Sequence, residues 1–139
     1  MNKKQKIICV VGPTACGKTK LGVKLASRFN GEIISADSRQ VYKGMDIGTG
    51  KDLCDYGKIP YHLIDIENPK KQITLFDWQK QAIEKIKEIN SREKVPFIVG
   101  GTGLYINSIV DGYILADQKI NKDFRKKLNN TPLPELQKM

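Results

Sequence analysis

Cysteine and histidine are scarce in this chain of 139 residues, which has three cysteines and one histidine. Cys9, Cys16 and Cys54 show no spacing typical of a metal site or a redox motif, so the sequence indicates neither. An odd and scattered set of cysteines is typical of a reducing cytoplasm. His62 alone excludes a multi-histidine metal site, and we interpret it as a polar residue at the start of a strand rather than as a catalytic one.

Long hydrophobic runs are also absent. No apolar segment approaches the roughly 20 residues that a membrane-spanning helix needs, so we expect no contact with a membrane interior. Residues 1–6 are basic, but the apolar run over residues 7–11 is too short for a signal peptide. The sequence therefore predicts a cytoplasmic protein.

Acidic residues are outnumbered, with 15 Asp and Glu against 24 Lys and Arg and a net charge of +9 at pH 7. Such an excess favours a polyanionic partner such as a nucleic acid. A lysine-rich composition also arises for unrelated reasons in bacterial proteins. Charge alone therefore leaves nucleic-acid binding open.

Strands and helices alternate along the chain, and the strands read as continuous apolar runs. This pattern favours an α/β fold with a parallel sheet. The polar segment 37–60 is predicted to be a loop with short helical turns. The expected strands cover residues 6–11, 32–36, 62–66 and 95–99, and the expected helices begin near Lys18, Thr74 and Gly103.

Several helix boundaries carry sequence signals. Thr74 and Asp77 have the spacing of a capping box, and Gly31 stands where a helix often ends with a glycine. Near the end of the chain, Asn121 is expected to cap one helix and the pair Thr131-Pro132 to open another. Large apolar residues at helical spacing are expected to face the core: Leu21, Leu25, Ala26 and Phe29 in the first helix, and Leu75, Trp78, Ala82, Ile86 and Ile89 in the second.

A phosphate-binding motif follows the first strand directly and opens the first helix. In Gly12-x4-Gly17-Lys18-Thr19, the glycines let backbone N–H groups point at phosphate oxygens, and the helix N-terminus adds partial positive charge. Lys18 supplies a mobile charge and Thr19 can hold Mg²⁺. With this motif we expect a P-loop NTPase-like three-layer fold, with a mostly parallel sheet flanked by helices. The predicted ligands of a diphosphate or a nucleotide are Gly12, Pro13, Thr14, Ala15, Cys16, Gly17, Lys18 and Thr19.

The carboxylate expected of a nucleotide hydrolase is missing from its usual place. The apolar run 95–99 ends in two glycines and Thr102 rather than in an aspartate. Asp37 instead follows the strand 32–36, at the end of the strand where open α/β sheets bind ligands. Taken by itself, Asp37 has three possible roles: support of a metal, general base, or loop cap.

Four segments occur in order with suitable separations: GPTACGKT (12–19), GEIISADSRQVYKGMDIGTGK (31–51), IPYHLIDI (59–66) and VGGTGLYI (99–106). Together they closely resemble the bacterial tRNA dimethylallyltransferases, or IPP transferases, over residues 6 to about 128. ISADSRQVYKGMDIGT combined with GGTGLY is specific to that resemblance, whereas a P-loop alone is not. Cys16 departs from the Ser or Ala expected within the loop, although its side chain is still small.

The resemblance implies a prenyl transfer without nucleotide hydrolysis. Such enzymes bind dimethylallyl diphosphate in the P-loop with Mg²⁺ and transfer the prenyl group to N6 of adenine 37, beside the anticodon, in tRNAs that read codons starting with U. The product is N6-dimethylallyladenosine. The resemblance favours Asp37 as the general base and places the Thr102 hydroxyl near the same adenine and Thr14 near the diphosphate.

The expected RNA contacts also come from this resemblance, because the adenine must leave the stack of the anticodon loop to react. They are Asp37, Ser38, Arg39, Gln40, Thr102 and Arg125, with the reservation that Arg125 also suits a solvated helix face. We expect a P-loop catalytic core over residues 1–115 and a basic helical segment over 116–139 that starts the second half of a longer protein, monomeric at full length. The alternatives are an adenylate isopentenyltransferase acting on AMP, ADP or ATP, a small-molecule P-loop kinase, and an inactive fragment that binds diphosphate or RNA.

Overall fold

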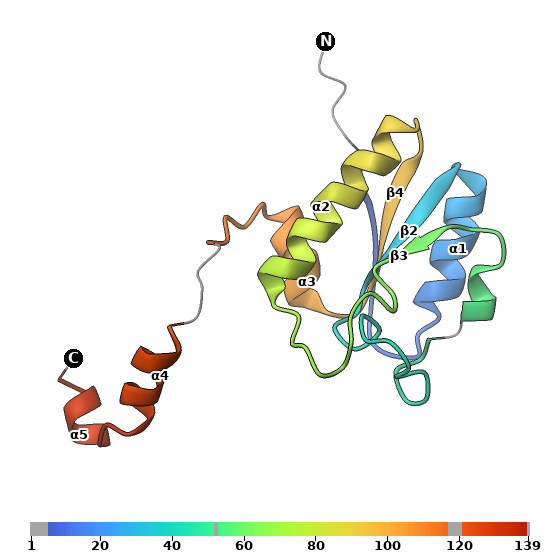
Figure 1. The fold of residues 1–139 in the computed structure, drawn as a ribbon. Coiled ribbons are helices and arrows are strands. Elements are labelled where there is room, and N and C mark those ends of the chain that lie inside the picture. The colour runs from blue at the N-terminus through green and yellow to red at the C-terminus, as the bar shows by residue number, and fades with distance from the viewer. Residues whose placement is uncertain (1–5, 52, 117–120, 139) are drawn as a thin grey trace, which may run out of the picture.

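A four-stranded parallel sheet forms the centre of the molecule (Figure 1). The computed structural model describes residues 6–51, 53–116 and 121–138. In spatial order the strands are β1 (Ile8–Val11), β4 (Val95–Gly100), β2 (Gly31–Ala36) and β3 (Tyr61–His62). The parallel sheet expected from the alternating pattern is therefore confirmed.

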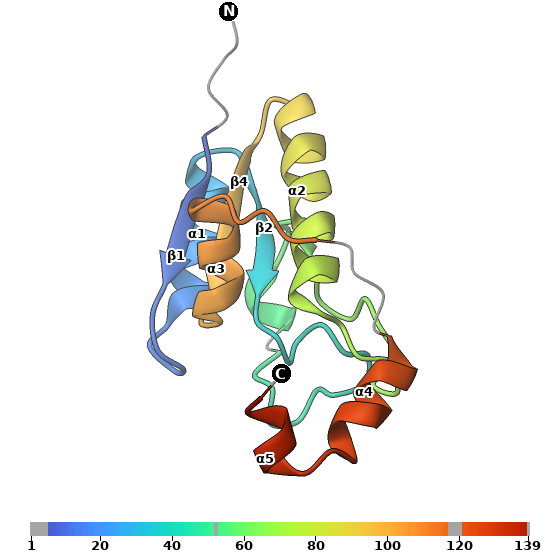
Figure 2. The ribbon, with the colours of Figure 1, turned by 90° about the vertical axis from the view of Figure 1, so that its left-hand side faces the viewer.

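Helices cover both faces of the sheet and give the expected three layers. Helix α1 lies on one face, while α2 and α3 pack together on the other (Figures 1 and 2). Helices α4 and α5 lie outside these layers (Figure 1). The helices are α1 (Lys18–Arg28), the 3₁₀ helix η1 (Leu53–Tyr56), α2 (Leu75–Ser91), α3 (Gly103–Val110), α4 (Lys122–Asn129) and α5 (Leu133–Leu136).

Strands β2 and β4 separate two cores, because successive side chains of a strand point to opposite faces. Ile34 and Ile98 face α2 and α3, whereas Ile33 and Phe97 face α1, and all four are fully buried. Trp78 of α2 is a core residue, as expected. Its ring stacks on Tyr105 and its Nε1 donates to the Ser35 carbonyl at 3.2 Å.

The capping predictions for two helices are confirmed. The Thr74 hydroxyl accepts from the Asp77 backbone N–H, and the Asp77 carboxylate accepts from Thr74 N, which completes the capping box of α2. Asn121 likewise caps α4 by accepting from Phe124 N at 2.9 Å. For α5, however, the capping position is Pro132 rather than Thr131, so that prediction is off by one residue.

The expected apolar face of α1 is correct for Ala26 and Leu25, which lie in or against the core, and wrong for the other two residues. Leu21 and Phe29 are each 51% exposed, whereas Gly22 and Ala26 are buried. A Cβ added at Gly22 would lie 2.8 Å from a methyl group of Val99, which shows how closely the helix approaches β4. This close approach selects the small residues Gly22 and Ala26 for the fully buried positions and leaves Leu21 and Phe29 exposed.

Gly31 does not end α1 but begins β2. Asn30 adopts the left-handed conformation instead, with φ of 51°. A Cβ at Gly31 would lie 2.3 Å from the Phe97 ring, so the strand needs a glycine there for packing. The expected strand over 62–66 is also shorter, because β3 ends at His62 and both Leu63 and Asp65 have positive φ.

Strand β1 is less buried than predicted, since it pairs only with β4 in the described part of the sheet. Val10 is buried, Cys9 is half-buried and Val11 is 57% exposed. Within residues 6–51, 53–116 and 121–138, no helix has both the length and the apolar character that crossing a bilayer requires. Residues 1–5 and 117–120, within the expected basic N-terminus and the expected C-terminal segment, lie outside the described residues.

Candidate active site

A cavity of about 380 Å³ opens at the carboxyl ends of the parallel strands. The P-loop follows β1, Asp37 follows β2, and Gly100 ends β4, so three consecutive positions in the sheet contribute to one site. This edge is where open α/β sheets bind their ligands. The lining residues are Thr14, Ala15, Gly17, Lys18, Thr19, Lys20, Asp37, Gln40, Thr49, Gly50, Asp55, Tyr56, Val99, Gly100 and Gly101.

The P-loop adopts a tightly turned backbone between β1 and α1. Gly17, at the start of α1, has φ of 83°, and Ala15 has φ of 62°, which is uncommon for a residue with a Cβ. Lys18 Nζ donates to the Pro13 carbonyl and lies 3.9 Å from Cys16 Sγ, so the amine reaches back across the loop. Free N–H groups at the helix start, next to a lysine amine, make this region suited to an anion.

Asp37 combines a structural contact with exposure to the cavity. Its Oδ1 accepts from the backbone N–H of Arg39 at 2.9 Å and of Gln40 at 3.3 Å, which forms a local turn and fixes the direction of the side chain. Among the residues that the structure describes, Oδ2 has no hydrogen-bond partner. Asp37 is therefore a loop cap that also presents an oxygen on the cavity shared with Lys18.

Thr102 lies next to Asp37 through a contact between the ends of two strands. Its Oγ1 accepts from Ser38 N at 3.0 Å, and its backbone N–H donates to the Ala36 carbonyl at 3.1 Å. Gly100 makes this approach possible, because a Cβ there would lie 2.2 Å from the same carbonyl. The structure thus brings together two residues that lie far apart in the sequence.

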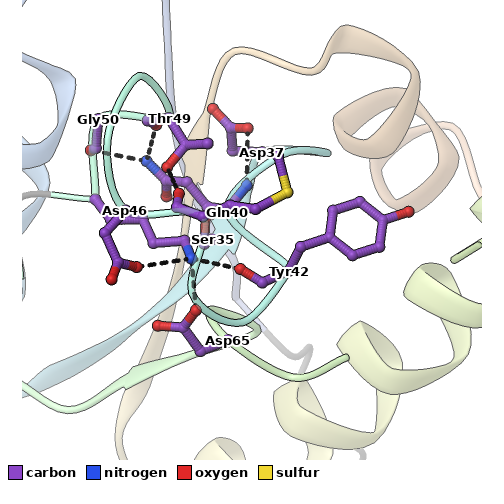
Figure 3. Close-up of polar contacts among 10 residues, drawn as sticks. Ser35, Asp37, Gln40, Tyr42, Asp46, Thr49, Gly50 and Asp65 are labelled. Atoms are coloured by element: carbon purple, nitrogen blue, oxygen red, sulfur yellow. Dashed lines mark hydrogen bonds and ion pairs between the residues drawn. The ribbon is translucent and has the colours of Figure 1, made fainter. Parts of the chain in front are cut away.

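Gln40 joins the cavity to a loop that the sequence analysis did not assign to it. Ser35 Oγ donates to Gln40 Oε1 at 3.0 Å, and Gln40 Nε2 donates to the carbonyls of Thr49 at 3.2 Å and Gly50 at 3.0 Å (Figure 3). Thr49 and Gly50 line the cavity. In the sequence, the one feature that marks these two residues is the pair of glycines at 48 and 50. In the structure, Gly48 and Gly50 both have positive φ and form a turn.

Not every predicted site residue lines this cavity. The residues outside the lining are Gly12, Pro13 and Cys16 of the P-loop, the exposed Arg39, and Ser38 and Thr102, which contact each other beside Asp37. Arg125 is also outside the lining. It lies on α4, where a surface hollow is lined by Lys122, Arg125, Lys126, Asn129 and Asn130.

The oxygen donors of the cavity fit Mg²⁺ only together with a ligand. The described residues contain no group of three His, Cys, Asp or Glu side chains that could hold a metal ion. Thr19 and Asp37 supply a hydroxyl and a carboxylate. Mg²⁺ is commonly held in this way, by one or two protein oxygens together with phosphate oxygens and water.

A buried ion cluster lies at the opposite, amino end of the sheet. The Glu32 carboxylate accepts from Arg92 at 2.8 Å and Lys94 at 2.9 Å, and it contacts His62 Nε2 at 2.7 Å. Burial alone raises the pKa of Glu32, but these partners outweigh it and bring the pKa to about 2. His62 thus serves a structural contact far from the cavity, in agreement with the non-catalytic interpretation.

Comparison with known proteins decides the family. The family described as IPP transferase matches residues 40–139, and the family described as isopentenyl transferase matches residues 5–57. The chain belongs to the IPP transferase family. The resemblance found in the sequence is thereby confirmed, and with it the P-loop NTPase-like fold.

The relatives of this IPP transferase chain include proteins named tRNA dimethylallyltransferase. One from Geotalea daltonii is 52% identical over 88% of this chain and 40% of its own length. One from Shewanella sediminis is 50% identical over 99% of this chain and 46% of its own length.

Solved structures give the same result. The full-length tRNA isopentenylpyrophosphate transferase of Bacillus halodurans is 48% identical, with a TM-score of 0.79 over 91% of this chain and 42% of that one. A eukaryotic dimethylallyltransferase acting on tRNA is 30% identical, with a TM-score of 0.81 over 92% of this chain and 33% of that one. The chain spans less than half the length of each of these four proteins.

Proposed function

We propose that this chain carries the donor site and the proton acceptor of a tRNA dimethylallyltransferase. The observation that supports this most directly is that Lys18 of the P-loop and Asp37 line the same cavity of about 380 Å³. The names of these relatives all give tRNA as the substrate, which favours tRNA over free adenylates as the acceptor.

The P-loop would hold the diphosphate of dimethylallyl diphosphate. Backbone N–H groups at the start of α1 and the Lys18 amine are placed to stabilise the negative charge that develops on this leaving group. The Thr19 hydroxyl would hold Mg²⁺ together with the diphosphate, and the ion would neutralise further charge there. The loop thus serves to bind and release a leaving group.

Asp37 would act on the acceptor. The adenine N6 attacks the first carbon of the dimethylallyl group, the bond from that carbon to the diphosphate oxygen breaks, and the N6 proton moves to the Asp37 carboxylate. The turn made by Oδ1 with Arg39 and Gln40 keeps the carboxylate oriented, which leaves Oδ2 for the amine. Thr102, held to Ser38, would orient the same adenine.

Further RNA contacts would come from residues that lie outside the reacting centre at Asp37 and Thr102. Ser38, Arg39 and Gln40 follow Asp37 directly and would meet the extruded base and its neighbours. Arg125, in the basic hollow of α4, would contact the phosphate backbone. We assign the core chemistry to residues 1–115 and an RNA-contacting role to 116–139, in a cytoplasmic protein that is monomeric at full length.

The test is a transfer assay with the chain as it exists. Dimethylallyl diphosphate, Mg²⁺ and an anticodon stem-loop containing adenine 37 should give N6-dimethylallyladenosine, and Asp37→Asn should reduce the rate at least about 100-fold. Binding of dimethylallyl diphosphate should stay within about twofold, since Asp37 acts mainly on the acceptor.

Three other results would each overturn a part of this proposal. Full activity of Asp37→Asn would remove the base assignment. Transfer to AMP in preference to the stem-loop would identify an adenylate isopentenyltransferase. Donor binding without any transfer, restored only when the chain is extended at its C-terminus, would show that these residues bind the donor but need the rest of a longer protein for catalysis.

A further inference from the structure

We propose that Lys51 is a positioning residue that holds the loop 43–50 in place as one wall of the donor cavity. The inference rests on the proposed function of that cavity. It concerns a lysine that does not line the cavity and that neither the P-loop motif nor Asp37 explains. Its role would be to fix the wall against which the donor lies.

The Lys51 amine is enclosed by three oxygen acceptors from two parts of the chain, the segment 42–46 and Asp65. It donates to Asp65 Oδ1 at 2.5 Å, to the Tyr42 carbonyl at 2.5 Å and to Asp46 Oδ1 at 3.3 Å, and its side chain is fully buried. In Figure 3 the oxygens of Tyr42, Asp46 and Asp65 surround one nitrogen atom. A lysine has three N–H donors, so the three acceptors match its bonding capacity.

The charge of Lys51 makes this arrangement specific. Burial by itself lowers the pKa of Lys51, but the hydrogen bonds and negative charges of Asp65 and Asp46 outweigh it and raise the pKa above its ordinary value. The amine is therefore a cation at neutral pH. A buried cation that loses a partner is costly, so the loop is held to this one geometry.

The connection from Lys51 to the cavity is short. Thr49 and Gly50, which line the cavity, precede Lys51 directly in the sequence. Their carbonyls accept from Gln40 Nε2, and Gln40 is itself held by Ser35 of β2. The loop 43–50 is thus held at two places: Gln40 binds its carbonyls next to the cavity, and the buried Lys51 binds Asp46 on the other side.

The partner side of the contact is rigid. Asp65 N donates to the Gln40 carbonyl at 3.0 Å, and Ile66 N donates to the Val41 carbonyl at 2.9 Å, so the two segments run together. Asp65 also has φ of 54°, a conformation that costs free energy unless the surroundings fix it. Lys51 therefore ties a glycine-rich loop to a firmly held segment.

The test compares Lys51→Met with Lys94→Met. Both remove a lysine that is paired with a carboxylate, but Lys94 pairs with Glu32 at the opposite end of the sheet. Lys51→Met should raise the Kd for dimethylallyl diphosphate at least about tenfold, because the wall is misplaced. It should also speed hydrogen exchange of residues 43–50. Lys94→Met should lower the unfolding midpoint without either effect.

A second variant keeps the test usable if Lys51→Met does not fold. Asp65→Asn removes the closest charged partner and should weaken donor binding in the same direction. The double variant should be no worse than Lys51→Met alone, since both changes remove one interaction. Additive losses would show that the two residues act separately and would overturn the proposal.

Failure of this inference is distinct from failure of the proposed function. Unchanged exchange of 43–50 in Lys51→Met, or an equal loss of donor binding in Lys94→Met, would show that Lys51 contributes only general stability. Faster exchange of 43–50 in a protein whose wild type does not bind dimethylallyl diphosphate would support the role of Lys51 in the loop and overturn the donor assignment.

Discussion

Lys18 and Lys20 both line the cavity, but only Lys18 reaches back across the P-loop. Lys18→Met should therefore weaken binding of inorganic diphosphate about 10- to 100-fold, the loss of one charge-assisted hydrogen bond. Lys20→Met removes the same charge from the first turn of α1, without touching the loop contact, and should change the Kd less than about threefold. Isothermal titration calorimetry with inorganic diphosphate measures the Kd of both variants. An equal loss of affinity in the two would show that binding depends on the net charge of the cavity rather than on the contact that Lys18 makes with the loop.

Glu32 gives the stability of the protein a specific dependence on pH. Its pKa is about 2 in the folded protein against about 4.5 for an ordinary glutamate, so the folded state favours the ionised form. The resulting stabilisation, about 3 kcal/mol, is complete above the unfolded value and is lost as the pH falls from about 5 toward 2. Urea unfolding between pH 7 and pH 3 measures this loss.

The variant Glu32→Gln should be less stable at pH 7 and should show a flatter dependence on pH below 5. Glu84→Gln, on the exposed side of α2, is the matched control and should follow the wild-type curve. If Glu32→Gln lost stability with falling pH as steeply as the wild type does, other carboxylates would account for the acid sensitivity.

At the scale of elements, the ends of β2 and β4 set the geometry around Asp37. Gly100→Ala would place a Cβ 2.2 Å from the Ala36 carbonyl, a backbone atom that cannot turn aside. The strands must separate there, so we expect a loss of about 1–3 kcal/mol in the free energy of unfolding and a reduced rate of transfer. Gly103→Ala is the control, because the space around that position is open. Equal stability of the two variants in urea would contradict this.

The same elements show what a sequence can predict. Strands β2 and β4 and helix α2 were predictable because their apolar patterns and the Thr74 cap are local signals. The buried face of α1 was predictable only in part: Ala26 was found, but periodicity favours large residues such as Leu21, whereas close contact with β4 selected Gly22. Which residues of α1 are buried depends on how closely the helix approaches the sheet, and no local sequence pattern encodes that distance.

The candidate site divides in the same way. The P-loop and Asp37 were found from the sequence because a motif and the end of a strand mark them. Thr49 and Gly50 were missed, because their place in the cavity depends on Gln40 and Lys51, and Lys51 depends on Asp65. Contacts between loops that are distant in the sequence leave only a weak local signal, here the glycines of the turn.

At the scale of the whole molecule, the net charge of +9 is spread over many lysines. Helix α4 carries a dense group of them around Arg125, and three of its cations line one hollow. Each cation that neutralises an RNA phosphate releases counterions, so binding weakens as salt is added. The charge therefore predicts affinity and salt dependence, but it does not predict which base reacts.

Binding of the anticodon stem-loop should thus fall linearly with salt on a double-logarithmic plot between 50 and 200 mM, as is general for phosphate contacts. Arg125→Ala should reduce the slope by about one, the contribution of a single phosphate contact. Lys87→Ala, an exposed lysine of α2, should leave the slope unchanged. Asp37→Asn should also leave it unchanged, because a carboxylate in the proposed role of general base would add no phosphate contact. An unchanged slope in Arg125→Ala would show that Arg125 contacts no RNA phosphate and is only part of the solvated face of α4.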